Sequence, residues 1–190
     1  ARERTRCRRA NTSSSERVLS AFKTAELANR EAFEDGDPMA SSEYIYPNQT
    51  HDAKRVVEMF YNNEDVRAIS IKKHVKVGAD GFMLACIREL CCHQDTRFAI
   101  HHSNVRIITG MSCRDWQTEL EGKAPECFRE NSIYHHGQLG KARLGQLENA
   151  IIFIDEIDTA SKDLQKLHLQ MRDAGLMDLA EIKRRNVRLV

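Results

Sequence analysis

The chain has 190 residues, of which 41% are hydrophobic and 30% charged, and its formal net charge is +1. These values are typical of a globular protein, and the length predicts one domain with an extension. No apolar run approaches the roughly 20 residues of a membrane span, and no apolar segment follows the basic start, so neither a membrane-spanning helix nor a signal peptide is predicted. We therefore expect an intracellular protein, cytoplasmic or nuclear, with no membrane partner.

The first part of the chain predicts an extension ahead of the folded domain. Residues 1–15 are basic and serine-rich, which predicts disorder, and residues 16–33 carry apolar side chains at helical spacing. An acidic stretch with glycine and proline, residues 34–38, predicts a linker. We therefore divide the chain into a basic, partly disordered extension with a helix (1–43) and a domain (44–190).

From residue 44 onwards, strand and helix patterns alternate. The strand patterns are Val66–Ile71, Arg97–Ile100, Val105–Gly110, Ser132–His136, Ala150–Ile154 and Asn186–Val190. The helix patterns lie at 53–61, 82–90, 115–120, 139–147 and 164–174, and Thr50 or Asn48 is the predicted cap of the first. Such alternation predicts an α/β fold with a mostly parallel sheet. Because the last strand pattern reaches the final residue, we expect a domain truncated at its C-terminal end.

The stretch from Ala150 to Asp158 carries the strongest functional signal. Five apolar residues predict a strand buried on both faces, and Asp155 and Glu156 follow at its carboxyl end, where open α/β sheets bind ligands. In the hydrolysis of a magnesium-bound nucleotide, one carboxylate holds the metal and a second polarises the attacking water. Asp155 is thus the candidate Mg²⁺ ligand and Glu156 the candidate catalytic carboxylate. The alternative is a core strand followed by a solvated acidic turn.

A second signal lies between the first strand pattern and the following helix. Residues 72–81 form a loop rich in lysine and glycine, and a helix pattern begins at Phe82. A strand, a glycine-containing loop and a helix are the layout of a phosphate-binding turn, because backbone N–H groups at the start of a helix attract anions.

Taken in order, these segments resemble the first RecA-like domain of a superfamily-two helicase of the DEAD/DEAH-like group, a three-layer P-loop NTPase fold. The resemblance covers about residues 44–190 and rests on four segments: Tyr46-Pro47-Asn48-Gln49, Lys76–Gly81, Thr109-Gly110-Met111-Ser112 and Asp155-Glu156-Ile157-Asp158. More narrowly, the sequence looks like the helicase-like proteins of large DNA viruses.

The resemblance also implies roles, cofactors and partners. It implies that Gln49 contacts adenine and that the phosphates of ATP lie against Lys76, Gly78, Ala79, Asp80 and Gly81. It implies contact between the nucleic-acid backbone and Thr109, Gly110 and Ser112. The implied cofactors are ATP and Mg²⁺. The implied partners are DNA or RNA and a second RecA-like domain downstream.

The phosphate loop departs from the family pattern Gly-x-x-x-x-Gly-Lys-Ser/Thr. The best alignment puts Lys73 at the first glycine, Ala79 at the lysine and Asp80 at the hydroxyl residue. The family's lysine neutralises phosphate charge and its hydroxyl holds Mg²⁺. Asp80 instead brings negative charge close to the phosphates. Lys73 and Lys76 are the cations that can reach in from elsewhere in the loop.

The basic residues and cysteines outside these motifs each allow a functional and a structural interpretation. Lys183-Arg184-Arg185 with Arg188, and Lys123 with Arg114, are candidate phosphate contacts or solvated surface. The six cysteines match no disulfide framework and contain no Cys-x-x-Cys pair, so reduced thiols are favoured over a zinc site at Cys91-Cys92-His93.

Three hypotheses for the function remain open. The first is a helicase-like, nucleic-acid-dependent ATPase. The second is a pseudo-ATPase that keeps the fold and binds nucleic acid or protein. The third is an α/β interaction domain that binds no nucleotide. Asp155 and Glu156 favour the first hypothesis, whereas Ala79 and Asp80 favour the other two.

Overall fold

The computed structural model describes the backbone of residues 2–73, 78–95, 97, 100–110, 120, 122–129, 132–155 and 163–190. Within these ranges it describes the side chains from Ser14 onwards, except at positions 129, 163 and 164.

A parallel β-sheet forms the centre of the molecule. Among the described residues its strands are β1 (Val105–Thr109), β2 (Ile133–His135), β3 (Ala150–Ile154) and β4 (Val187–Leu189), and their order is β2-β1-β3-β4. All neighbouring strands are parallel, which confirms the predicted α/β class and parallel sheet. The predicted strand Val66–Ile71 is reduced to one parallel bridge from Ala68 to Leu189, because β4 beside it is only three residues long.

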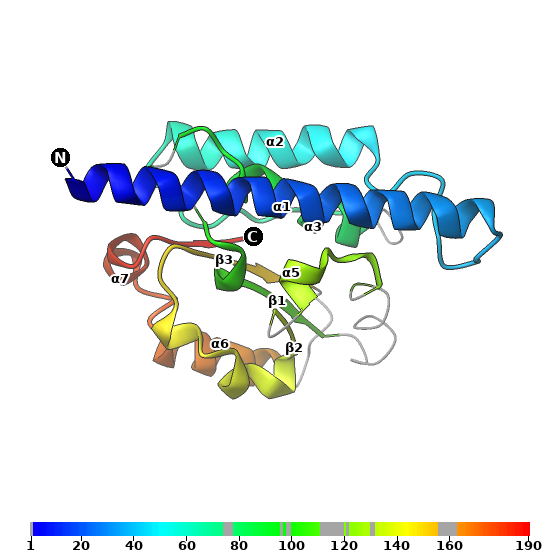
Figure 1. Cartoon of the computed structure of the whole chain (residues 1–190). Helices are drawn as coiled ribbons and strands as arrows, with labels where there is room; N and C mark the ends of the chain where they lie inside the picture. Colours follow the sequence, from blue (N-terminus) through cyan, green and yellow to red (C-terminus); the bar gives the residue numbers. More distant parts are fainter. Residues whose placement is uncertain are drawn as a thin grey trace.

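Helices cover both faces of this sheet, which makes three layers (Figure 1). One face carries α1 (Arg2–Glu34), α2 (Pro47–Asn62), α3 (Ala79–Cys91) and the short α5 (Glu126–Arg129), and η2 (His102–Asn104) precedes β1. The other face carries η3 (His136–Ala142), η4 (Leu144–Gln146), α6 (Asp163–Asp173) and α7 (Leu179–Arg184).

Strand β3 shows how the sheet joins the two outer layers. Ile151 and Phe153 pack into the core beneath α1, α2 and α3, and Ala150 and Ile152 pack into the core beneath α6. All four side chains are at most 1% exposed. The continuous apolar run in the sequence is therefore explained by burial on both faces, as predicted for a parallel strand.

Helix α1 is part of the same core as the helices that follow it. Val18 and Phe22 are buried, and the Phe22 ring centroid lies 6.4 Å from that of Tyr44 and 5.6 Å from that of Phe128. The helix predicted over 16–33 is confirmed but begins earlier, at Arg2. The backbone of residues 2–15 is thus helical where disorder was predicted, which fits the high helix propensity of its arginines, alanine and glutamate.

The remaining elements agree with the sequence in part. Helices α2, α3 and α6 and strands β1, β2, β3 and β4 fall where their patterns predict them. The helix predicted over 139–147 is replaced by two short 3-10 helices, η3 and η4. Helix α2 starts at Pro47 with Tyr46 as its cap, so the prediction of Thr50 or Asn48 was wrong. Helix α7, capped by the Asp178 side chain, was not predicted because it is short. The predicted strand 97–100 and helix 115–120 lie mostly outside the described residues.

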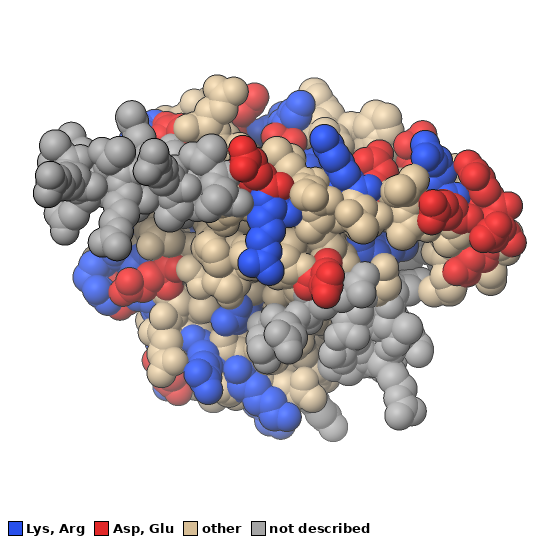
Figure 2. Space-filling view, viewed as in Figure 1, with Lys and Arg blue, Asp and Glu red and all other residues tan. Residues whose placement is uncertain are grey.

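Charges are unevenly distributed over the surface (Figure 2). Acidic side chains gather where α1 ends and the linker begins, and the exposed ones are Glu31, Glu34, Asp35, Asp37 and Glu43. Among the described residues, no helix is both long and apolar enough to cross a membrane.

The basic cluster near the C-terminal end is not an open phosphate surface. Lys183 pairs with Asp65, and Arg184 pairs with Glu181 at 2.7 Å. Arg185 is buried and donates to the carbonyl oxygens of Leu147, Ala174 and Leu144. Arg188 is also buried, with its guanidinium 5.5 Å from the centroid of the Phe60 ring.

Candidate functional site

Asp155 stands where β3 ends, at the carboxyl edge of the sheet. Its N–H donates to the carbonyl oxygen of Ile108 on β1 at 2.8 Å, which fixes the backbone where the strand leaves the sheet. Its side chain is only 4% exposed, and its Oδ1 lies 2.6 Å from Nζ of Lys73. A buried carboxylate needs a partner of opposite charge, because an unpaired one loses several kcal/mol of hydration. Lys73 provides that charge from the loop before α3.

The start of α3 forms the other side of the candidate site. Gly78 is the N-terminal cap of the helix and adopts left-handed dihedral angles, φ 72° and ψ 59°, which glycine allows without strain. The aligned positions Ala79 and Asp80 occupy the first turn. The N–H groups of a first helical turn have no partner within the helix and favour an anion, so this turn is suited to phosphate.

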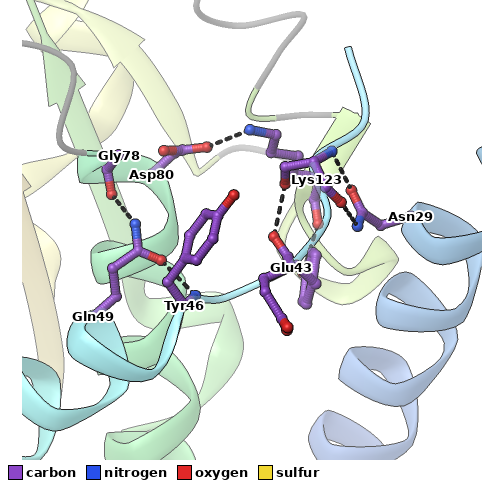
Figure 3. A network of polar contacts seen from close by, with 9 residues as sticks. Asn29, Glu43, Tyr46, Gln49, Gly78, Asp80 and Lys123 are labelled. Atoms are coloured by element: carbon purple, nitrogen blue, oxygen red, sulfur yellow. Dashed lines mark hydrogen bonds and ion pairs between the residues drawn. The ribbon is translucent and has the colours of Figure 1, made fainter. Parts of the chain in front are cut away.

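Gln49 connects this turn to α2 (Figure 3). Its Oε1 accepts from the N–H of Tyr46 at 2.8 Å, and its Nε2 donates to the carbonyl oxygen of Gly78 at 2.7 Å. The side chain is buried and lies directly over two glycines. A Cβ at Gly81 would lie 2.8 Å from Cδ of Gln49, and a Cβ at Gly78 would overlap its Nε2. Gln49 therefore holds the loop in place.

The second acidic residue of the site also has a lysine partner (Figure 3). Nζ of Lys123 lies 2.8 Å from Oδ2 of Asp80, and the two side chains are 25% and 23% exposed. The Tyr44 hydroxyl donates to the carbonyl oxygen of Lys123 at 2.6 Å, which fixes the backbone that carries this lysine. The linker ahead of Tyr44 is itself tied to α1, since Asn29 donates to the carbonyl oxygen of Ser41 at 2.8 Å.

The candidate nucleic-acid segment follows β1. The Thr109 side chain is 1% exposed and therefore lies inside the protein. Nε2 of His135 lies 3.3 Å from the carbonyl oxygen of Gly110, and Nδ1 of His135 accepts from the N–H of Gly137. The end of β1 is thus held by β2, and Ser112 lies outside the described residues.

The fold brings most of the described candidates to one edge of the sheet. Asp155 and Thr109 end adjacent strands, while the loop before α3 follows the extended segment on the far side of β4. Since neighbouring strands are about 4.8 Å apart, Asp155 and that segment are separated by roughly 10 Å. Lys73 bridges this gap. Lys76 and Glu156 lie outside the described residues. Lys123 was predicted to be a phosphate contact or a solvated surface residue, and its ion pair with Asp80 was not predicted.

The residues described at this edge do not fit Mg²⁺. The metal prefers hard oxygen donors and keeps several of its waters. Here the Asp155 and Asp80 carboxylates each already hold a lysine ammonium, and the hydroxyl expected at position 80 is replaced by a carboxylate. Within the described part of the chain, no group of three or more His, Cys, Asp or Glu side chains is placed to hold a metal.

The described cysteines are free thiols in apolar surroundings. Cys86 and Cys91 are buried, and Cys92 and Cys127 are half-buried. Burial raises the pKa of Cys92 to about 11, and it also raises the pKa of Cys86 and Cys91. Because the thiolate is the reactive form, these residues act as small apolar side chains and not as nucleophiles.

Comparisons with models of protein families, with curated proteins and with solved structures found no match to this chain.

Proposed function

We propose that this chain is a helicase-type, RecA-like domain that binds ATP without turning it over, that is, a pseudo-ATPase. The ion pair between Lys73 and Asp155, at 2.6 Å, is the observation that carries the proposal. It places a cation from the loop before α3 against the acidic end of β3. A nucleotide site needs these two elements together, because the phosphates lie between the loop and the sheet edge.

Lys73 supplies the charge that Ala79 cannot supply. Its side chain is 38% exposed, so its ammonium is within reach of a ligand, whereas Asp155 beneath it is buried. In this proposal, phosphate lies on the first turn of α3 and is held by N–H groups of that turn and by the Lys73 ammonium. Gln49, which already bonds to Gly78, is the proposed adenine contact at the same turn.

Loss of turnover follows from the same contacts. Hydrolysis needs an electrophilic metal beside the phosphates and a carboxylate that polarises water. The Asp155 oxygen that would serve the metal holds Lys73, and the hydroxyl residue is replaced by Asp80. We therefore propose that bound ATP remains intact, and that the domain serves nucleic-acid or protein binding, with Gly110 and the residues after it as the proposed nucleic-acid contact.

Isothermal titration with ATP, followed by a phosphate-release assay with single-stranded DNA and RNA, tests this proposal. Binding without phosphate release is expected. Phosphate release that disappears in Glu156→Gln would instead establish a working ATPase. If ATP fails to bind at millimolar concentration, the remaining candidate is an α/β interaction domain that binds no nucleotide. The observation that favours this second candidate is the presence of Ala79 and Asp80 where the family has lysine and a hydroxyl residue.

A further inference from the structure

We infer that the candidate site takes its nucleotide without a metal ion, and that Lys73 and Lys123 supply the positive charge that Mg²⁺ supplies elsewhere. This inference rests on the proposed function, because it specifies the form of nucleotide that the same site binds.

The evidence is that the two described carboxylates of the candidate site are paired in the same way. Asp155 at the end of β3 holds the ammonium of Lys73 at 2.6 Å, and Asp80 in the first turn of α3 holds the ammonium of Lys123 at 2.8 Å. Each lysine comes from a different segment than the carboxylate it contacts. These two carboxylates and two ammonium groups have a formal charge sum of zero, so the acidic groups described at the site already have their charge compensated.

An ammonium group can bridge a carboxylate and a phosphate as a metal does. It has three N–H donors, and the single contact with a carboxylate oxygen engages one of them. Lys73 and Lys123 can therefore keep their aspartates and still donate to phosphate oxygens, and such charge-assisted bonds are about twice as strong as neutral ones. Partial exposure of both lysine side chains, 38% and 25%, leaves them open to a ligand.

A metal would have to displace these lysines. Mg²⁺ at Asp155 would have to break the ion pair that this buried carboxylate already makes, and Mg²⁺ loses its own waters reluctantly. Asp80 would present a second carboxylate near the phosphates once Lys123 moved away, and like charges at short range repel. The backbone of Lys123 is also held in place, because the Tyr44 hydroxyl donates to its carbonyl oxygen. These contacts favour the two lysines over a metal.

ATP titrations in EDTA and in excess Mg²⁺ test the inference with the full chain. The expected result is that ATP in EDTA binds within about threefold of its affinity in Mg²⁺, or more tightly, because the lysines attract the more highly charged free nucleotide. Binding that occurs only with Mg²⁺ would overturn the inference and leave the proposed function intact. An absence of binding under both conditions would overturn the proposed function as well.

Substitutions of the Asp80–Lys123 pair give effects of opposite sign. In Lys123→Gln, loss of one charge-assisted contact weakens ATP binding in EDTA by about tenfold, and added Mg²⁺ recovers part of it. In Asp80→Asn, removal of the negative charge tightens binding in EDTA. Lys141→Gln is the matched control, since Lys141 is an exposed lysine on η3. Equal affinities for Lys123→Gln and Lys141→Gln, at equal thermal stability, would overturn the role of Lys123.

Discussion

The two sides of the candidate site are built by different physical means. Asp155 follows the last residue of β3. The first four side chains of this strand are at most 1% exposed, so apolar burial on both faces of the sheet positions Asp155. The body of α3 also packs into the apolar core, through Leu84, Ile87 and Leu90. Its first turn is held in addition by polar contacts from distant segments, namely Gln49 on Gly78 and Lys123 on Asp80. The difference shows that apolar burial alone positions the strand side, whereas the first turn of α3 depends in addition on a few specific polar side chains.

Truncation of a core residue on β3 should have the largest effect. Phe153→Ala removes a ring that is 1% exposed and leaves a cavity, and we expect a loss of about 3–5 kcal/mol of unfolding free energy. Urea unfolding measures this loss of free energy. Leu169→Ala on α6 is the control, because that side chain is 46% exposed and its loss should change stability by less than about 0.5 kcal/mol. Similar losses for the two variants would contradict positioning by apolar burial.

Removal of Gln49 should have the next largest effect, through hydrogen bonds. Gln49→Ala leaves the Tyr46 N–H and the Gly78 carbonyl without the side chain that bonds them, which should cost about 2–3 kcal/mol. Gln49→Glu keeps the shape but cannot donate to Gly78, so it should also destabilise. Gln138→Ala, at an exposed position, is the control. If Gln49→Glu were as stable as the unchanged chain in urea, the bond to Gly78 would have no structural role.

The close approach of Gln49 to Gly81 gives a smaller, steric effect. A Cβ added at Gly81 would overlap the Gln49 amide, whereas a Cβ at Gly140 would meet nothing within 4 Å. Gly81→Ala should therefore lose about 1–3 kcal/mol, and Gly140→Ala should be close to neutral. Thermal unfolding of the two variants side by side provides the measurement, and equal midpoints would show that the loop adjusts freely.

The far end of α3 should give the smallest effect, and it depends on pH. Cys92 caps that end, and its pKa is raised to about 11 because burial disfavours the thiolate. A raised pKa in the folded state contributes stability that is present below pH 9, the ordinary thiol value, and is lost as the pH rises towards 11. Allowing for partial exposure, the loss should be about 1 kcal/mol. In Cys92→Ser, measured under reducing conditions, the decline of stability between pH 8 and 11 should be shallower than in the unchanged chain.

The sequence predicted the strand side better than the helix side. Strand β3 and the position of Asp155 at its end follow from a local apolar run. The Gln49–Gly78 and Lys123–Asp80 contacts join residues that are separated by 29 and 43 positions in the sequence. No local sequence pattern indicates contacts over such separations. The alignment of the phosphate loop predicted negative charge from Asp80 close to the phosphates, and Lys123, from outside the loop, pairs with that carboxylate.

The same reasoning applies to the two ends of the chain. Residues 1–43 were predicted to form an extension ahead of the domain, and Val18 and Phe22 of α1 pack into the central core. The basic cluster near the other end was open to interpretation as a phosphate contact, but Arg185 and Arg188 are buried. Composition alone does not distinguish an arginine that donates to buried carbonyls from one that faces solvent.

The affinity for ATP of Lys73→Gln compared with Lys72→Gln is the most direct test of the account. The two lysines are adjacent, and Lys73 contacts Asp155 while Lys72 is exposed. We predict that Lys72→Gln binds ATP as the unchanged chain does and that Lys73→Gln binds at least about tenfold more weakly. The double variant Lys73→Gln/Asp155→Asn removes the buried Asp155 charge together with its partner, and its thermal stability shows whether a loss of binding is a loss of folding. Unchanged ATP affinity in Lys73→Gln would contradict the account.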